Sequence, residues 1–142
     1  MEFRKATEDD VSALYELHQM MNREELAMGC SFSHPIKKSA LKRLITNPLN
    51  PSIVCIVRGR IKAFAYAERQ GEDLLLHNVF VLPEYRKCGI ATKMFHKITG
   101  KRGGKIYAYV LNKNDSALRF WQNKGFTTEK FLPNAVKISR LI

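Results

Sequence analysis

One short stretch, residues 79–92, constrains the fold more than any other part of the chain. It reads Val-Phe-Val-Leu-Pro-Glu-Tyr-Arg-Lys-Cys-Gly-Ile-Ala-Thr. An apolar run ends at Pro83, a basic turn with Gly89 follows, and a helical pattern begins directly after it. A helix N-terminus leaves backbone N–H groups without partners and carries a partial positive charge. The stretch therefore predicts a strand, a turn and a helix that together form an anion site.

The turn has the spacing Arg86-x-x-Gly89-x-Ala91. This is neither the glycine fingerprint of dinucleotide-binding folds nor a Gly-Lys-Ser/Thr phosphate loop. It resembles the acyl-CoA pyrophosphate loop of the GNAT N-acetyltransferase superfamily, whose pattern is Arg or Gln, two residues, Gly, one residue, and Gly or Ala. A strand-like segment at 74–81 precedes the turn and a helix-like segment at 91–98 follows it, which is the context that phosphate binding requires.

A second segment supports the same resemblance. Residues 114–126 read Asn-Asp-Ser-Ala-Leu-Arg-Phe-Trp-Gln-Asn-Lys-Gly-Phe. They resemble the C-terminal motif of the superfamily, in which an Asn and a small residue open the last helix and Gly-Phe closes it. The two motifs occur in the expected order, and the order of all the predicted elements extends the resemblance over essentially the whole chain.

The hydrophobic periodicity predicts an α/β (α+β) protein with a single domain over residues 1–142. The predicted elements are a strand at 2–6, a helix that starts after Thr7, a helix at 35–44, strands at 52–57, 61–67 and 74–81, a helix at 91–98, a strand at 106–111, a helix at 116–124 and a terminal hairpin within 127–142. The resemblance implies a mixed, mostly antiparallel sheet of six or seven strands with about four helices. It also implies that the fourth and fifth strands splay apart.

Composition excludes several classes of protein. Hydrophobic residues make up 45% of the 142 residues, which is ordinary for a globular protein, and the longest apolar runs are far short of a membrane span. The N-terminus lacks the layout of a secretory signal, so we expect a cytoplasmic protein with no membrane partner. Cys30, Cys55 and Cys88 are widely spaced and form no Cys-x-x-Cys motif, which argues against a disulfide framework and against a metal site.

The resemblance implies that acetyl-CoA is the cosubstrate. Main-chain groups of Val79, Phe80 and Val81 would meet the pantetheine arm, and backbone N–H groups of the loop would hold the pyrophosphate. The Arg86 side chain either joins them or braces the loop, and Asn114 either contacts pantetheine or caps a helix. The residues expected to contact CoA are Val79, Phe80, Val81, Arg86, Lys87, Cys88, Gly89, Ile90, Ala91, Thr92, Asn114 and Trp121.

The general base is the first point where the chain departs from the superfamily. A Glu is common on the strand before the loop, but Leu75 stands at the corresponding position. His77 follows two residues later, on the same face of the predicted strand, and its imidazole could accept a proton directly or through water. The alternative is a buried, hydrogen-bonded structural histidine. Glu68, Glu24 and Glu25 are further acidic candidates.

Trp121 is the second departure. The superfamily commonly has a Tyr there, and its phenol serves as general acid for the departing thiolate. An indole N–H donates a hydrogen bond but keeps its proton in this pH range. Tyr85 is a candidate substitute, whereas Tyr107 and Tyr109 fit strand packing better. The predicted catalytic residues are therefore His77 and Tyr85.

Charge adds a question about partners. The chain has 24 Lys and Arg against 13 Asp and Glu, a net charge of +11 spread along its whole length. We expect an acetyl-CoA-dependent N-acetyltransferase in which a primary amine of a small molecule or peptide attacks directly within a ternary complex. An acidic macromolecule could instead supply the amine. The alternative is a non-catalytic CoA-binding or basic module that contacts nucleic acid or protein.

Two further expectations come from the resemblance. The segment around residues 22–36 would build the acceptor pocket. Pairing of two chains through the C-terminal strands, giving a homodimer, is common in the superfamily.

Overall fold

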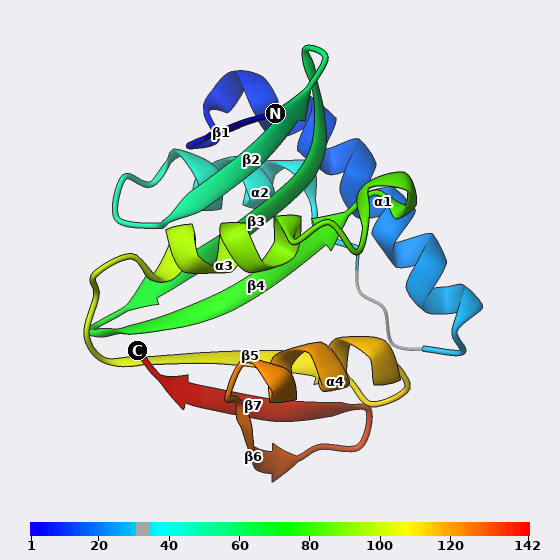
Figure 1. Ribbon diagram of the computed structural model, residues 1–142, viewed down its shortest axis with the longest axis vertical. Coiled ribbons are helices and arrows are strands. Elements are labelled where there is room, and N and C mark those ends of the chain that lie inside the picture. Colours follow the sequence, from blue (N-terminus) through cyan, green and yellow to red (C-terminus); the bar gives the residue numbers. More distant parts are fainter. Residues whose placement is uncertain (31–34) are drawn as a thin grey trace.

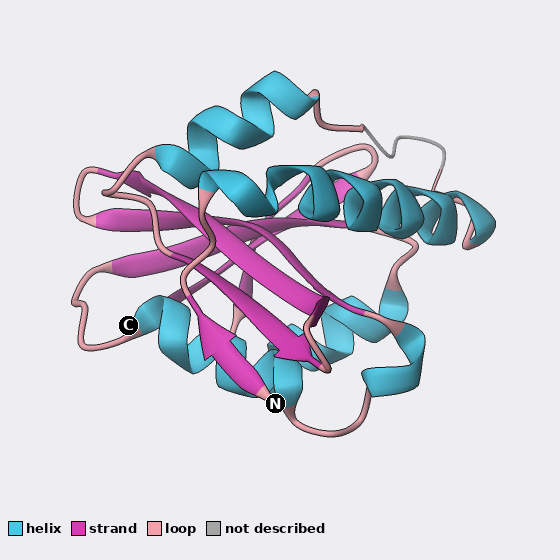
Figure 2. Cartoon of the chain, turned by 90° about the horizontal axis from the view of Figure 1, so that it is seen from above, coloured by secondary structure: helices cyan, strands magenta, loops and turns pink. Residues whose placement is uncertain are grey.

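A computed structural model describes residues 1–30 and 35–142 of the chain. These residues form one seven-stranded sheet in the order β1-β2-β3-β4-β5-β7-β6, with helices on both of its faces (Figures 1 and 2). The strands are β1 (Glu2–Arg4), β2 (Ser52–Val57), β3 (Arg60–Gln70), β4 (Asp73–Val81), β5 (Lys105–Leu111), β6 (Thr127–Phe131) and β7 (Ala135–Leu141). The α-helices are α1 (Val11–Ala27), α2 (Lys38–Thr46), α3 (Ile90–Thr99) and α4 (Asp115–Asn123). Every neighbouring pair is antiparallel except β4 and β5, which confirms the predicted fold class.

The predicted elements are all present, with shifted ends. The largest shift is in α2, which was expected at 35–44 and runs over Lys38–Thr46. It continues past the expected end and stops at Thr46, because Asn47 precedes Pro48 and is extended, with φ −72° and ψ 116°. A short 3₁₀ turn at Glu8–Asp10 precedes α1. A second one, Pro83–Tyr85, precedes residues 86–89, which lead into α3 and are called the phosphate loop below.

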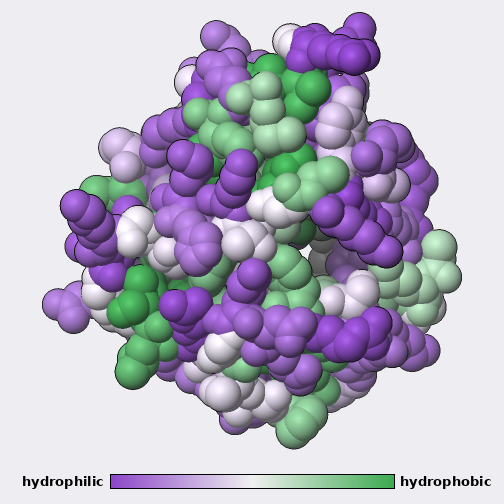
Figure 3. All heavy atoms as spheres, viewed as in Figure 1, coloured by the Kyte–Doolittle hydropathy of each residue, from purple (hydrophilic) through white to green (hydrophobic). Residues whose placement is uncertain are grey.

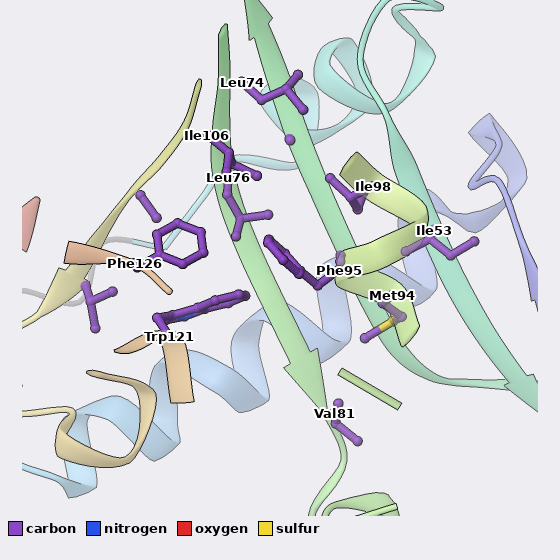
Figure 4. Packing of buried hydrophobic residues seen from close by; sticks show 14 of the residues in the cluster. Ile53, Leu74, Leu76, Val81, Met94, Phe95, Ile98, Ile106, Trp121 and Phe126 are labelled. Carbon is purple, nitrogen blue, oxygen red and sulfur yellow. The ribbon is translucent and has the colours of Figure 1, made fainter. Parts of the chain in front are cut away.

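The sheet separates two hydrophobic cores. On the face covered by α3 and α4, the rings of Phe95, Trp121 and Phe126 lie 5.2–5.7 Å apart by centroid and meet at steep angles, as Figure 4 shows. On the face covered by α1 and α2, the cluster contains Leu14, Phe64 and other apolar side chains. Both cores arise because apolar residues recur at helical spacing on the helices and fill both faces of the central strands.

Strands β4 and β5 pair only at their beginnings. The parallel pairing comprises Leu74 opposite Ile106 and Leu75 opposite Tyr107, and it ends there. Beyond these pairs the two strands diverge (Figure 1). The predicted splay between the fourth and fifth strands is therefore confirmed.

A β-bulge interrupts β4 where this divergence begins. Tyr66 of β3 lies opposite Asn78, but the next residue, Ala67, lies opposite Leu76. His77 is thus an extra residue on β4. A bulge of this kind breaks the alternation of side chains along a strand.

Because of the bulge, consecutive side chains point to the same face. The His77 ring stacks on Tyr66 at 5.5 Å between centroids with 18° between planes. The amide nitrogen of Asn78 also reaches Tyr66 and donates to its phenol oxygen at 3.1 Å. Simple alternation along β4 would have placed these neighbours on opposite faces.

A buried hydrogen bond ties α1 to the centre of the sheet. The His18 Nε2 lies 2.8 Å from the Tyr66 hydroxyl, and both residues are almost completely buried. Burial lowers the pKa of His18 to about 4, with a smaller contribution from the charge of His77. Burial also raises the pKa of the Tyr66 phenol. Both groups are therefore neutral at pH 7.

The start of β5 depends on a close backbone approach at Gly104. This residue has φ +90°, and a Cβ atom there would lie 2.4 Å from the Glu72 carbonyl oxygen. We predict that Gly104→Ala lowers the free energy of unfolding by about 2 kcal/mol or more, because backbone must move and the φ value is strained. Gly103→Ala is the matched control, since nothing lies within 4 Å of its Cβ position. Urea unfolding of both variants measures the difference, and equal stabilities would contradict the prediction.

The buried His18 should make stability depend on pH. Its folded pKa is about 4, whereas the unfolded chain binds this proton near pH 6.5. The stabilisation is thus fully present above pH 6.5 and is lost as the pH falls towards 4. We predict a loss of about 2 kcal/mol between pH 7 and pH 5 from this residue. Urea unfolding of His18→Gln should show a flatter pH dependence, with the exposed His96→Gln as control. Parallel pH profiles for wild type and His18→Gln would refute the prediction.

Candidate functional site

A cavity of about 680 Å³ opens where β4 and β5 diverge. Figure 3 shows a hollow at this place on the face that carries α3 and α4. The cavity is lined by β4 over residues 76–81, by β5 over residues 108–111, by the loop and the start of α3, and by residues of α1 and α4. Every predicted CoA contact except Cys88 belongs to this lining.

One end of the cavity is an array of backbone N–H groups. Lys87 and Gly89 have positive φ values of 62° and 79°, and α3 begins directly after them. The first intrahelical hydrogen bond of α3 runs from the Lys93 N–H to the Gly89 carbonyl at 3.0 Å. Within the described residues, the N–H groups of residues 87–92 donate no hydrogen bond. They form the kind of helix N-terminus that binds phosphate.

The Arg86 side chain braces this loop. Its Nε donates to the Val81 carbonyl at 2.8 Å, and its terminal nitrogens lie 2.9 Å from both carboxylate oxygens of Glu24 on α1. The guanidinium also lies over the Phe80 ring, 5.5 Å from its centroid. Of the two roles predicted for Arg86, the structure shows bracing. Glu24, which the sequence named as an acidic candidate for the general base, is held in this ion pair.

Main-chain groups of two β4 residues face the cavity. The Leu82 N–H donates to the Lys62 carbonyl at 3.0 Å, so Leu82 and Lys62 form a hydrogen-bonded pair. In an antiparallel ladder every second pair of opposed residues is hydrogen-bonded, so the next such pair along β4 is at Phe80. Phe80 is then hydrogen-bonded to β3, whereas Val79 and Val81 direct their N–H and C=O groups towards the diverging β5. The prediction of Phe80 as a main-chain contact is therefore corrected, because the sheet already uses those groups.

His77 lies towards the other end of the part of β4 that lines the cavity, and it has a carboxylate partner. Its Nε2 is 2.9 Å from Glu68 Oε1, and the two side chains are 27% and 39% exposed. If Nε2 carries the proton and donates it to Glu68, Nδ1 is left as the acceptor. His77 lines both this cavity and a second one. The structure thus brings together His77 and Glu68, which the sequence named separately.

The remaining predicted residues lie as follows. Tyr85 lines the cavity at the loop end, with the Lys62 amine 5.7 Å from its ring centroid. Val81 precedes Tyr85 in the chain and is about 13 Å from His77 along the strand. Tyr85 and His77 therefore lie at opposite ends of the cavity. Cys88 is exposed, and its thiol contacts the Arg86 carbonyl at 3.4 Å.

Asn114 and Trp121 each combine two roles. The Asn114 Oδ1 accepts from the Ala117 N–H at 3.2 Å and so caps α4, while the residue also lines the cavity. Trp121 is 7% exposed and packs in the core. Its indole nitrogen makes no hydrogen bond within residues 1–30 and 35–142, yet no buried side-chain nitrogen or oxygen there lacks a partner. The indole nitrogen is therefore not completely buried, and Trp121 lines the cavity.

A second cavity of about 400 Å³ adjoins the first. It shares Met21, Glu25, His77, Asn78 and Leu111 with the first cavity and extends to Pro35 and Ile36 before α2. This is the side where the sequence predicted an acceptor pocket over residues 22–36. Residues 31–34 of that segment lie outside the described residues.

Sequence reasoning missed the polar network beneath His77. Tyr66, His18 and Asn78 were not among the predicted site residues, yet they are linked by hydrogen bonds and all three line the second cavity. A Tyr inside an apolar strand and a His at helical spacing are ordinary core patterns, so neither residue carried a signal.

The described residues contain neither a candidate metal site nor a membrane-spanning helix. Across 1–30 and 35–142, no group of three or more His, Cys, Asp and Glu side chains is placed to hold a metal ion. None of the helices within these ranges has the length and apolar character needed to cross a bilayer.

Comparison with known proteins agrees with this geometry. The family model of the acetyltransferase (GNAT) domain matches residues 50–128. A thialysine N-epsilon-acetyltransferase of Mus musculus is 27% identical over 120 residues, which cover 81% of this chain and 66% of the relative. The Bos taurus enzyme of that name is 25% identical over 95 residues, which cover 64% and 56%. The chain thus matches between about half and two thirds of the length of these relatives.

The fold is also shared with solved structures. The PaiA N-acetyltransferase of Thermoplasma acidophilum, in complex with coenzyme A, has a TM-score of 0.82 at 17% identity, over 99% of this chain and 98% of that one. The family match covers more than half of the 142 residues and includes the phosphate loop. By its sequence motifs, its splayed sheet and this match, the chain belongs to the GNAT acetyltransferase family.

Proposed function

We propose that this protein is an acetyl-CoA-dependent N-acetyltransferase that acetylates a primary amine by direct attack within a ternary complex. The single observation that carries the proposal is the layout of the first cavity. It runs from the free N–H groups of residues 87–92, past the main chain of Val81 and Val79, to the imidazole of His77. A ligand with an anionic group at one end and a reactive carbonyl at the other fits that order.

The residues present fit CoA along this path. The loop N–H groups and Lys87 would hold the pyrophosphate, because a helix N-terminus and a lysine both favour negative charge. The N–H and C=O groups of Val79 and the N–H of Val81 would pair with the amides of the pantetheine arm, while the Val81 carbonyl is held by Arg86. The PaiA N-acetyltransferase of Thermoplasma acidophilum, which has the same fold, binds coenzyme A in its solved structure, and this supports CoA as the ligand.

Acetyl-CoA, when bound, supplies an acetyl thioester as the electrophile. His77 would take the proton that the attacking amine loses, at Nδ1 and directly or through water, while Glu68 holds the ring through Nε2. A backbone N–H of Val79 or Val81 would stabilise the oxyanion. The indole N–H of Trp121 would donate a hydrogen bond to the departing thiolate, since Tyr85 lies at the opposite end of the cavity.

The acceptor we propose is a small primary amine, with thialysine as the first to test. Two relatives that match by sequence are thialysine N-epsilon-acetyltransferases. On a chain of net charge +11, Glu25 lines both cavities and Glu68 lies beside His77, whereas Glu24 is already paired with Arg86. The net positive charge of the protein repels a cationic acceptor, but salt screens distant charges more than near ones. The nearby carboxylates therefore outweigh that repulsion and favour a cationic acceptor at the site.

The function is tested with purified protein, acetyl-CoA and a panel of thialysine, spermidine, lysine and N-terminal peptides. Release of free CoA thiol should depend on one of these amines. Acetyl-CoA alone should raise the melting temperature by mass action. Absence of both effects at millimolar acetyl-CoA would refute the proposal. Salt-sensitive nucleic-acid binding without acetyl transfer would favour the basic binding module instead.

The conformation of Gly89 should matter for CoA binding. An alanine there meets no atom within 4 Å but must adopt φ +79°, so the loop relaxes and the N–H groups turn. We predict that Gly89→Ala weakens CoA binding by about tenfold or more, measured by calorimetry. Gly71→Ala is the matched control, with φ +64°, equally open space and a place outside the cavity. Both variants should lose similar stability, and equal CoA affinities would contradict the predicted role.

His77 should act in transfer and not in CoA binding. We predict that His77→Gln lowers kcat by about 100-fold, because the amine loses its proton acceptor, while the Kd for CoA stays unchanged. Glu68→Gln should lower kcat less, since it only weakens the hold on the ring. His96→Gln, on the exposed side of α3, is the control. A His77→Gln variant with normal kcat would show that His77 is structural.

A further inference from the structure

Asn78 is a polar residue of the site to which the proposed reaction gives no role. It follows His77 in the bulge of β4 and lies on the same face. Both cavities include it in their lining, so it stands where they join. A side chain at this place faces whatever approaches His77 from the second cavity.

A buried chain of hydrogen bonds fixes the orientation of the Asn78 amide. Its nitrogen donates to the Tyr66 hydroxyl oxygen at 3.1 Å. The phenol hydrogen is then left for the Nε2 of His18, 2.8 Å away. His18 can accept it because burial lowers its pKa to about 4 and keeps the ring neutral. Tyr66 is 2% exposed and His18 is 3% exposed, so the bond between these two residues is shielded from water.

The same chain leaves the Asn78 oxygen free. Within the described residues, Oδ1 accepts no hydrogen bond, and no side-chain nitrogen or oxygen buried there lacks a partner. Oδ1 is therefore reached from the cavities that Asn78 lines. The site presents two neighbouring acceptors, this oxygen and Nδ1 of His77, on one face of β4.

We propose that Asn78 is a specificity residue that accepts a hydrogen bond from the attacking amine, and that Tyr66 and His18 are positioning residues that keep its oxygen outward. The inference rests on the N-acetyl transfer proposed above. A neutral primary amine has two N–H bonds and one lone pair. One N–H points at His77 and the second at Asn78, which directs the lone pair to the thioester carbonyl carbon.

The reaction that this arrangement serves is balanced. The amine nitrogen forms a bond to the carbonyl carbon, the C–S bond breaks, and its electron pair leaves on the thiolate of CoA. The proton of the amine passes to His77. The N–H held by Asn78 stays in the amide product. A secondary amine has only one N–H, so it cannot satisfy both acceptors, and the site selects primary amines against their N-methyl derivatives.

The test compares primary and N-methylated acceptors at saturating acetyl-CoA. The probe is thialysine, or whichever amine of the panel the wild type acetylates fastest, with its N-methyl derivative. We expect Asn78→Ala to raise the KM for the primary amine about tenfold or more and to reduce its preference over the N-methyl amine. The Kd for CoA should not change. Asn78→Asp, which keeps an oxygen, should recover part of the loss.

A double-mutant cycle tests the positioning role of Tyr66. Tyr66→Phe alone should raise the acceptor KM, because the amide is then free to turn. In the Asn78→Ala background it should add nothing to that KM, since Tyr66 acts only through the amide. A merely structural role would leave the acceptor KM unchanged and appear only in urea unfolding. Asn50→Ala, a buried asparagine outside both cavities, is the control for general destabilisation.

The outcomes separate the two proposals. If the wild type transfers acetyl to no amine, the proposed function fails before any variant is compared, and this inference fails with it. If the wild type is active and folded Asn78→Ala keeps both its acceptor KM and its preference for the primary amine, this inference alone is overturned. Should Asn78→Ala not fold, Asn78→Leu, which keeps the shape without the polar atoms, replaces it under the same criteria.

Discussion

The separation of β4 from β5 is the constraint on which the rest of the site depends. Two pairs, beginning at Leu74 and Ile106, hold the parallel strands together, and everything beyond them is open. Strand edges that lack a partner must find other hydrogen bonds, and here the open edges line a cavity. Beside this opening, Trp121 of α4 and Phe126, which follows that helix, pack into the hydrophobic core.

The bulge at His77 places the polar side chains of His77 and Asn78 beside the opening. An extra residue in β4 turns two consecutive polar side chains to one face, where Glu68 and Tyr66 receive them. Tyr66 is in turn anchored by His18 on α1. The helix that covers the second core thus also contributes to the order of the site. Core and site are in this sense one network, in which buried polar groups are satisfied by each other.

Much of this could be predicted from local pattern. The strand, turn and helix around Gly89 follow from apolar runs, a proline and a permissive glycine, and these are nearest-neighbour effects. The positions of Asn114 and Gly125 around α4 are of the same kind, since caps act within one turn. What could not be predicted is which groups meet across strands. Arg86 was assigned to the loop, but its partners, Glu24 and Val81, were not foreseen.

The sequence by itself determined the order of elements, the fold class and the loop suited to phosphate, because periodicity, prolines, glycines and caps act over a few residues. Only the tertiary structure decided that Glu68 holds His77, that the main-chain groups of Val79 and Val81 face the cavity while those of Phe80 pair with β3, and that the Asn78 amide points outward. Those outcomes depend on strand register and on one bulge. Register is set by packing between distant segments, which no local pattern contains.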